Sequence, residues 1–361
     1  MKKSIRLAIP ALALLGPRLF ITLILGADLA AAGSPASGGE PAPLRICATT
    51  PDLRSLAESL GGERVEVICF SQGLEDPHLI ELRPGQVRAL NRAELYLQVG
   101  LGIENAWLEP LMQRAQNDAT KPGGPGNLNL GQGVRPLAGP AATPPPGSFH
   151  ESGNPHYLLD PVEGLKAARA ICDRLVTLRP AWEPFFDDRH RAFVDEWARV
   201  WFGPEVAARI DLGPLEDFAS PEALEDDLSR WAREYRAQLG GVLGELAPFA
   251  GAGIVGDHDL WPYFARRFGL EVVAYLEPSP GVPPTTRHLR EVIRRMQERG
   301  VKVVLTAPYF PPEHARLVAR ETGARVTPLA HQTGAAEGAD SYLRMIAHNV
   351  AQLRAALTAG E

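Results

Sequence analysis

Short apolar runs alternate with helical patterns twice along this chain, and that alternation limits the possible folds more than any other feature. Strand-like runs of the first series lie at residues 44–49, 65–70, 95–99 and, more weakly, 134–137. Those of the second series lie at 252–255, 271–276, 301–305 and 324–329. Strands that alternate with helices form parallel sheets covered by helices on both faces. We therefore predict an α/β protein with two lobes, each built on a four-stranded, mainly parallel sheet.

Helical patterns fill the gaps between these runs. Pro51 stands at the first position of the first helix, after which leucines recur every three or four residues. The last helix carries an apolar stripe that we assign to the core, at Tyr342, Met345, Ile346, Val350 and Leu353. Further helices are predicted at residues 84–92, 104–117, 261–268, 286–299 and 312–322.

Long amphipathic segments at 161–178, 181–201 and 221–246 join the two series and predict a stiff, helical connection. Gly203-Pro204 and Gly213-Pro214 interrupt it. The predicted organisation is an N-terminal lobe, a bridge with an insertion, and a C-terminal lobe, at residues 44–178, 179–247 (insertion 202–219) and 248–361. A segment rich in Gly and Pro at 121–153 is expected to be a mobile loop of the first lobe.

The N-terminus has the pattern of a secretory signal. Basic residues precede an apolar run at 7–25, and Ala30-Ala31-Ala32 offers a cleavage site. Pro17 and Arg18 keep the run short of the roughly 20 uninterrupted apolar residues that a membrane span needs. We expect a signal peptide at 1–32 and a linker at 33–43. No cysteine lies near the cleavage site to carry a lipid, so we expect a soluble periplasmic protein.

Charge and cysteine content exclude some classes of protein. The formal net charge is −6 and becomes −9 once the predicted signal is removed, so nucleic acid is not an expected partner. Cys47, Cys69 and Cys172 are an odd number, which leaves at least one thiol free. We interpret all three as buried thiols, with a Cys47–Cys69 disulfide as the alternative.

Three histidines stand in short loops after strand-like runs. His78 and His156 occur in the similar phrases Asp76-Pro77-His78 and Asn154-Pro155-His156, and His258 follows Gly256-Asp257. A single histidine is more often a surface or core residue than a ligand. Because loops at the carboxyl ends of parallel strands gather at one edge, however, these three can meet across two facing lobes. Imidazole suits Zn²⁺ in particular, so we predict a metal site in the cleft.

A fourth ligand is needed to close a tetrahedral site. Asp340 lies after the last strand of the second lobe and would give each lobe two ligands, although an isolated Asp at this place is more often a helix N-cap. His331 is the reserve candidate. Histidines within helices among charged residues are expected to face solvent, at 190, 288, 314 and 348.

Several phrases of the chain resemble the metal-binding receptors of zinc and manganese ABC importers. They include Thr49-Thr50-Pro51-Asp52-Leu53, the two Pro-His phrases, Trp261-Pro262-Tyr263-Phe264, Glu277-Pro278-Ser279-Pro280-Gly281 and Gly338-Ala339-Asp340-Ser341-Tyr342. The resemblance covers roughly residues 44–356. It implies two four-stranded lobes bridged by a long helix, with one metal held by His78, His156, His258 and Asp340. Many zinc receptors have a histidine-rich loop near 121–153, whereas this chain has only His150 there.

The resemblance implies a monomeric periplasmic receptor that captures Zn²⁺ and delivers it to the membrane subunits of an ABC permease. A manganese receptor of the same family is the main alternative, since harder cations prefer oxygen ligands, and three histidines favour zinc over it. A zinc hydrolase would need an open coordination position and a general base. The chain has no His-Glu-x-x-His run, so we expect a binding protein rather than an enzyme.

Overall fold

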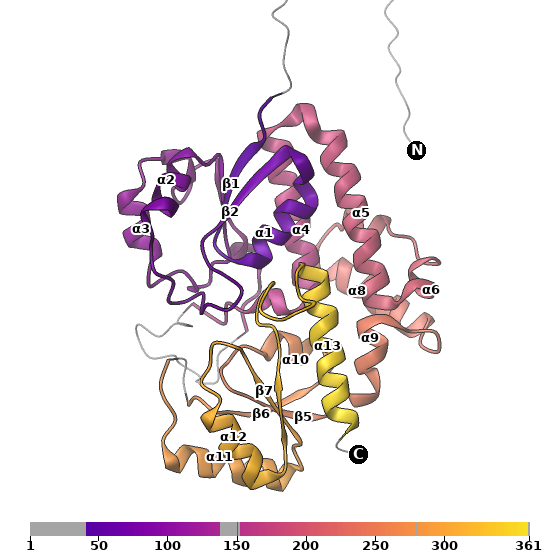
Figure 1. Ribbon diagram of the computed structural model, residues 1–361. Coiled ribbons are helices and arrows are strands. Elements are labelled where there is room, and N and C mark those ends of the chain that lie inside the picture. The colour runs from indigo at the N-terminus through magenta and orange to yellow at the C-terminus, as the bar shows by residue number, and fades with distance from the viewer. Residues whose placement is uncertain (1–40, 138–149, 151, 279–280, 360–361) are drawn as a thin grey trace, which may run out of the picture. The chain divides into compact units, whose positions relative to one another are not determined.

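The computed structural model describes residues 41–137, 150, 152–278 and 281–359 (Figure 1). The predicted signal peptide and residues 138–149 of the predicted mobile loop lie outside this part of the chain. Residues from Ala42 onward form one compact unit. Among the described residues, no helix is long and apolar enough to cross a membrane.

The N-terminal sheet is entirely parallel and has the order β2-β1-β3-β4. Its strands are β1 (Leu44–Ala48), β2 (Val65–Cys69), β3 (Leu95–Gln98) and β4 (Asn127–Asn129). In β1, Leu44, Ile46 and Ala48 are buried in the main apolar cluster, whereas Cys47 belongs to a second cluster on the opposite face. This alternation follows from the two-residue period of a strand and shows that both faces of the sheet are covered.

The C-terminal sheet repeats the plan with the order β6-β5-β7-β8, again parallel throughout. Its strands are β5 (Gly253–Gly256), β6 (Glu271–Tyr275), β7 (Val303–Thr306) and β8 (Arg325–Pro328). Ile254 and Val303 face the main cluster, and their neighbours Val255 and Val304 face a cluster formed with the helices α11 (Thr286–Arg299) and α12 (Glu313–Thr322). The prediction of two four-stranded parallel sheets with helices on both faces is confirmed.

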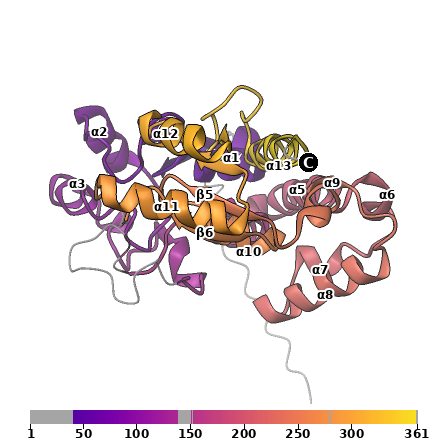
Figure 2. The ribbon, with the colours of Figure 1, turned by 90° about the horizontal axis from the view of Figure 1, so that it is seen from below.

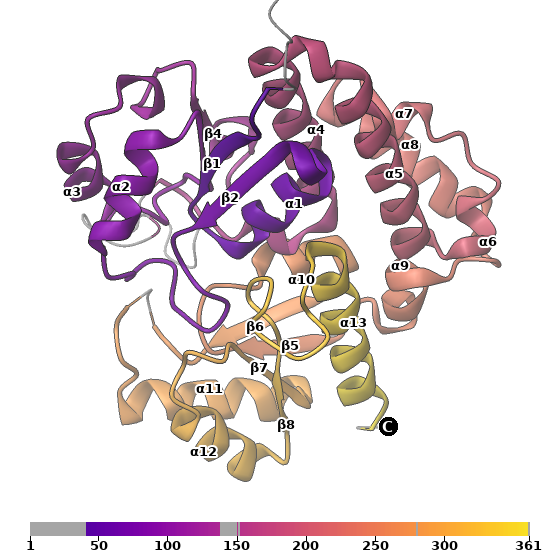
Figure 3. The ribbon, with the colours of Figure 1, turned by 45° about the horizontal axis from the view of Figure 1, so that its top comes forward.

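Helices cover the sheets and join them. Figures 2 and 3 show α11 and α12 beside the C-terminal sheet, and α6 to α9 grouped at one side of the molecule near α5. Around the first sheet lie α1 (Pro51–Gly61), α2 (Pro84–Arg92), α3 (Leu108–Arg114) and α4 (Pro161–Leu178). Between the sheets in sequence come α5 (Glu183–Phe202), α6 (Pro204–Ala207), α7 (Gly213–Glu216), α8 (Pro221–Glu234) and α9 (Gly241–Leu246). Those of the second half are α10 (Pro262–Phe268), α11 (Thr286–Arg299), α12 (Glu313–Thr322) and α13 (Tyr342–Thr358).

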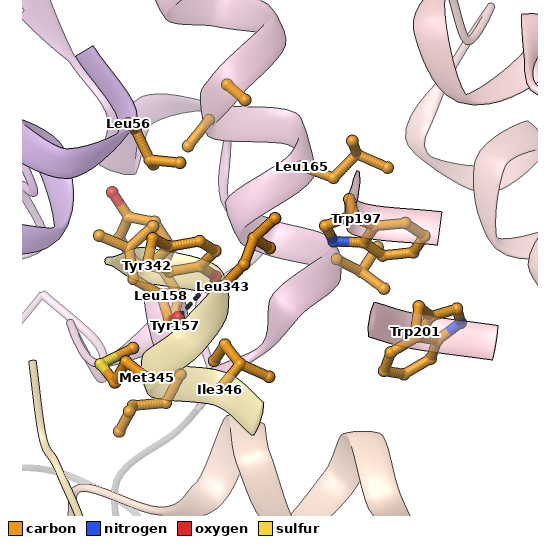
Figure 4. Packing of buried hydrophobic residues seen from close by; sticks show 14 of the residues in the cluster. Leu56, Tyr157, Leu158, Leu165, Trp197, Trp201, Tyr342, Leu343, Met345 and Ile346 are labelled. Atoms are coloured by element: carbon orange, nitrogen blue, oxygen red, sulfur yellow. Dashed lines mark hydrogen bonds between the residues drawn. The ribbon is translucent and has the colours of Figure 1, made fainter. Parts of the chain in front are cut away.

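One apolar core is shared by the two halves. Figure 4 shows Leu56 of α1 and Leu165 of α4 near Tyr342 and Ile346 of α13, with Trp197 of α5 beside them. The predicted stripe of α13 is buried along its length, which confirms that it is core. Because the second half's last helix packs into the same cluster as helices of the first half, the two sheets are held together by apolar contact as well as by chain connection.

Three predicted elements differ from the structure. The fourth strand of the first sheet is β4 at 127–129, not 134–137; it pairs with β3, and the Arg174 guanidinium donates to the carbonyl of Asn127 at 2.9 Å. The helix predicted at 104–117 spans only Leu108–Arg114, and residues 101–107 form turns, with positive φ at Leu101 and Gly102. The helix predicted at 221–246 is divided into α8, which ends at Glu234, and α9, which begins at Gly241. Gly241 has φ +55°, outside the helical range, and a Cβ there would lie 2.3 Å from the Val200 carbonyl oxygen.

The cysteines are free thiols in the structure. Cys47 and Cys172 are buried as predicted, whereas Cys69 is only partly buried. Cys47 pairs in register with Ile68 and not with Cys69, so the two thiols leave opposite faces of the sheet. The alternative of a Cys47–Cys69 disulfide is not seen.

His190 is buried in α5, and the prediction that it faces solvent is wrong. Its Nδ1 lies 3.4 Å from a nitrogen of the Arg169 guanidinium, so the neutral ring must accept there. Burial, with the neighbouring Arg169 charge, lowers the pKa of His190 to about 4.

This shift predicts how the free energy of unfolding depends on pH. Below about pH 6.5 the unfolded chain protonates this histidine and the folded chain does not, so its contribution to stability is lost as the pH falls toward 4. Relative to His190→Gln, which keeps an acceptor for Arg169, the wild type should lose up to about 2 kcal/mol between about pH 6.5 and about pH 5. Urea unfolding of both proteins measures the difference, with the partly exposed His314→Gln as control. A difference that does not change with pH would contradict the assignment.

Candidate metal centre

The two Pro-His phrases fold in the same way. The Asp76 carboxylate accepts the backbone N–H of His78 at 2.9 Å, and the Asn154 side-chain oxygen accepts that of His156 at 2.9 Å. Each phrase is therefore a short turn closed by its first residue, with Pro fixing the backbone between. The backbone N–H of His258 is accepted by its own neighbour Asp257 at 2.8 Å. A local polar side chain thus sets the direction of each histidine.

The structure brings His78, His156 and His258 together and adds His150 as a fourth member. One ligand atom of each of the four buried side chains lies within 4.8 Å of those of the other three. Their ring centroids are 5.0 to 5.9 Å apart. The Nε2 atoms of His150 and His156 approach to 3.2 Å. We call these four residues the histidine cluster.

Carboxyl groups hold three of the four rings from behind. The Nδ1 atom of His78 lies 2.9 Å from the Asp76 carboxyl group, that of His258 lies 2.6 Å from Glu277, and that of His150 lies 3.4 Å from Asp259. A carboxylate that accepts from Nδ1–H places the lone pair on Nε2, which is the atom that then faces the other rings. This arrangement orients three imidazoles as metal ligands.

The cluster favours neutral imidazoles. Burial, with neighbouring imidazoles, lowers the pKa of His150 to about 4 and that of His258 to about 3, and it holds the pKa of His156 well below its usual value. Burial also raises the pKa of Glu277 to about 7. Neutral imidazole is the form that coordinates a metal, so near neutral pH these three rings need not lose a proton to bind one.

The spacing fits a small tetrahedral cation. Zn–N bonds of about 2.0–2.1 Å place the nitrogens of a tetrahedral site about 3.3 Å apart. The His150–His156 separation of 3.2 Å is already at this value. With every pair within 4.8 Å, the remaining side chains need to shift by only about 1 Å to reach it. Four nitrogen ligands would leave no open coordination position.

Asp340 is not brought to the cluster. Its carboxylate is 66% exposed and pairs with Arg344 of α13 at 3.1 Å, one helical turn away. It is not the N-cap either, since Ser341 holds that place and accepts from the Arg344 backbone N–H. The fourth member of the cluster is His150, whereas the sequence predicted Asp340 as the fourth ligand. The reserve candidate His331 is buried, but its Nε2 bonds to the Glu75 carbonyl at 3.1 Å and it is not one of the four.

Sequence reasoning missed His150 because nothing local marks it. It lies in the segment rich in Gly and Pro, outside any helical or strand period, and its partner Asp259 is 109 residues away. The available signal was weak: it is the single histidine of that segment and stands six residues before His156.

Comparison with known proteins identifies the family of the chain. The model of the family described as zinc-uptake complex component A, periplasmic (ZnuA), matches residues 46–201 and 219–356. The high-affinity zinc uptake system protein ZnuA of Yersinia pestis is 24% identical over 282 residues, which are 75% of this chain and 77% of that protein. The manganese-binding lipoprotein MntA of Halalkalibacterium halodurans is 21% identical over 339 residues, or 92% and 95% of the two chains.

Solved structures share the fold. A crystal structure of ZnuA superposes with a TM-score of 0.60 at 22% identity and covers 87% of this chain and 99% of its own. The protein FpvC of Pseudomonas aeruginosa, solved with Mn²⁺, gives 0.63 at 22% identity and covers 88% and 100%. The family match extends over both sheets and confirms the resemblance found in the sequence. The chain belongs to the ZnuA family of periplasmic metal-binding proteins of ABC importers.

Proposed function

We propose that this protein is a zinc receptor that captures Zn²⁺ in the periplasm and delivers it to the permease of an ABC importer. The ligands we propose are His78, His156 and His258, with His150 as the fourth. One observation carries the proposal: four buried imidazole nitrogens converge within 4.8 Å, and three of their rings are oriented from behind by carboxyl groups. Zn²⁺ is here the cargo of the protein.

The donor set supports zinc over manganese. Manganese binds the same nitrogen ligands more weakly than zinc does and prefers carboxylate, carbonyl and water oxygens. In this cluster the carboxyl groups contact the Nδ1 atoms, which face away from the centre of the cluster. The atoms that face the centre are ring nitrogens. Relatives that carry manganese in their names keep the alternative open, and the metal titration below includes it.

The same geometry supports a receptor over a hydrolase. A catalytic zinc site keeps three protein ligands and one open position for water. Four histidines fill a tetrahedral shell, and the cluster is buried. Capture and release of the ion is the chemistry that such a closed site can perform.

Metal titration tests the proposal. Purified metal-free protein should bind one Zn²⁺ per chain in competition with a chromophoric chelator, and at least about a hundredfold more tightly than Mn²⁺, as expected for nitrogen ligands. Equal or tighter binding of Mn²⁺ would favour the manganese receptor, and absence of binding to either ion would refute a metal receptor. The intact mass of the exported protein checks the proposed removal of residues 1–32.

A further inference from the structure

A loop of the C-terminal half holds the loop that carries His78. The side-chain nitrogen of Gln332 donates to the carbonyl of Gln72 at 2.6 Å and to that of Glu75 at 3.0 Å. His331 donates from Nε2 to the same Glu75 carbonyl at 3.1 Å. Glu75 is followed directly by Asp76, whose carboxylate accepts hydrogen bonds from the backbone N–H and from the Nδ1 atom of His78. A short series of contacts therefore links Gln332 to a member of the histidine cluster.

Backbone packing brings the two loops into direct contact. A Cβ added to Gly73 would lie 2.4 Å from the carbonyl carbon and oxygen of Gly334, so only glycine allows this approach. Beside it, the buried Asp52 carboxylate of α1 accepts the backbone N–H and the hydroxyl of Thr333, both at 2.7 Å. We call residues 331–334 the clasp.

The clasp is anchored firmly to its own half. The buried Asn349 side chain of α13 accepts the backbone N–H of Ala330 and donates to its carbonyl, both at 2.8 Å. These two hydrogen bonds to the residue before the clasp connect the clasp to a helix in the shared core. The loop at 72–76 is thus supported from outside the N-terminal sheet by a part of the C-terminal half.

We propose that Gln332 is a positioning residue that holds the His78 loop in its metal-binding place and so slows the release of the bound ion. The proposal rests on the proposed function, because it concerns a metal bound by His78. Gln332 does not belong to the histidine cluster. Its effect passes through the carbonyls of residues 72 and 75 to Asp76, and from Asp76 to the imidazole. Because a carbonyl oxygen can only accept a hydrogen bond, the group of Gln332 that contacts both carbonyls must be its amide nitrogen, which donates.

The test replaces the donor without changing the shape of the side chain. Gln332→Glu puts an oxygen where the amide nitrogen was, facing two carbonyl oxygens, and should increase the rate of Zn²⁺ dissociation into excess chelator about tenfold. Gln332→Ala removes the side chain and should act in the same direction. The matched control is Gln297→Glu, which removes a similar glutamine-to-carbonyl bond at the end of α11, to Glu321.

Hydrogen exchange separates positioning from general loss of stability. In metal-free Gln332→Glu, exchange should be faster at the backbone amides of Asp76 and His78, while β5 and β7 keep their protection. If the wild type binds no metal, the proposed function fails. If the wild type binds Zn²⁺ but both Gln332 variants release it at the wild-type rate, the clasp does not position His78. Faster release with unchanged exchange at Asp76 and His78 would also overturn the proposal.

Discussion

Replacing His258 by alanine should lower the affinity for Zn²⁺ at least about a hundredfold. Loss of an outer partner of a metal ligand alone costs about 10- to 100-fold in metal affinity, and loss of the ligand itself must exceed this. The pKa of His258 is lowered to about 3 by burial and by the neighbouring His78, so the ring is neutral and ready to coordinate. The same loss is expected for His78→Ala and His156→Ala. A competition titration at pH 7.5 measures the affinity.

The fold should survive these changes, since the four imidazoles pack on one another, with ring centroids 5.0 to 5.9 Å apart, in loops outside the helices and strands. Circular dichroism and the unfolding midpoint of the metal-free variants check this point. His314→Ala, in the partly exposed part of α12, serves as the control and should bind as the wild type does. The ligand assignment is wrong if two of the three variants bind zinc normally.

Much of the fold could be predicted because its signals are local. Apolar runs of about five residues and a proline at the first helical position mark the strands and the start of α1, and the limits of α2 and α11 were predicted to the residue. The fourth strand could not be found in this way. Asn127-Leu128-Asn129 has almost no apolar pattern, and its strand conformation depends on pairing with β3. The strand at 127–129 therefore depends on tertiary structure, which the local periodicity of the sequence does not reveal.

The site residues also differ in whether local sequence predicts them. His78, His156 and His258 follow short turns whose first residues act locally, so the sequence contains the reason for their direction. The fourth member, His150, has no Pro-His phrase of this kind in the sequence. Asp340 was chosen from a symmetry of two ligands per lobe, but its exposed carboxylate lies just before α13 and pairs with Arg344 in the first turn of that helix.

We expect His150 to contribute to zinc binding and Asp340 not to contribute. His150→Ala should lower the affinity for Zn²⁺ at least about tenfold, with water free to take the vacated position. Asp340→Ala should change it less than about twofold, because the carboxylate is exposed and its ion pair with Arg344 is of a kind that contributes little. The two variants are measured in one chelator competition series against the wild type.

X-ray absorption at the zinc edge gives a second, independent measurement. Wild-type protein and Asp340→Ala should both show four nitrogen ligands with the outer-ring scattering of imidazole, whereas His150→Ala should show three imidazoles and an added oxygen. If instead Asp340→Ala loses more affinity than His150→Ala, the bound state uses the carboxylate. In that case the chain around residue 340 must rearrange on loading, since the Asp340 side chain would have to leave Arg344 and solvent to enter a buried site. The affinity ratio of the two variants therefore decides between a preformed four-histidine shell and one completed by movement of the second half.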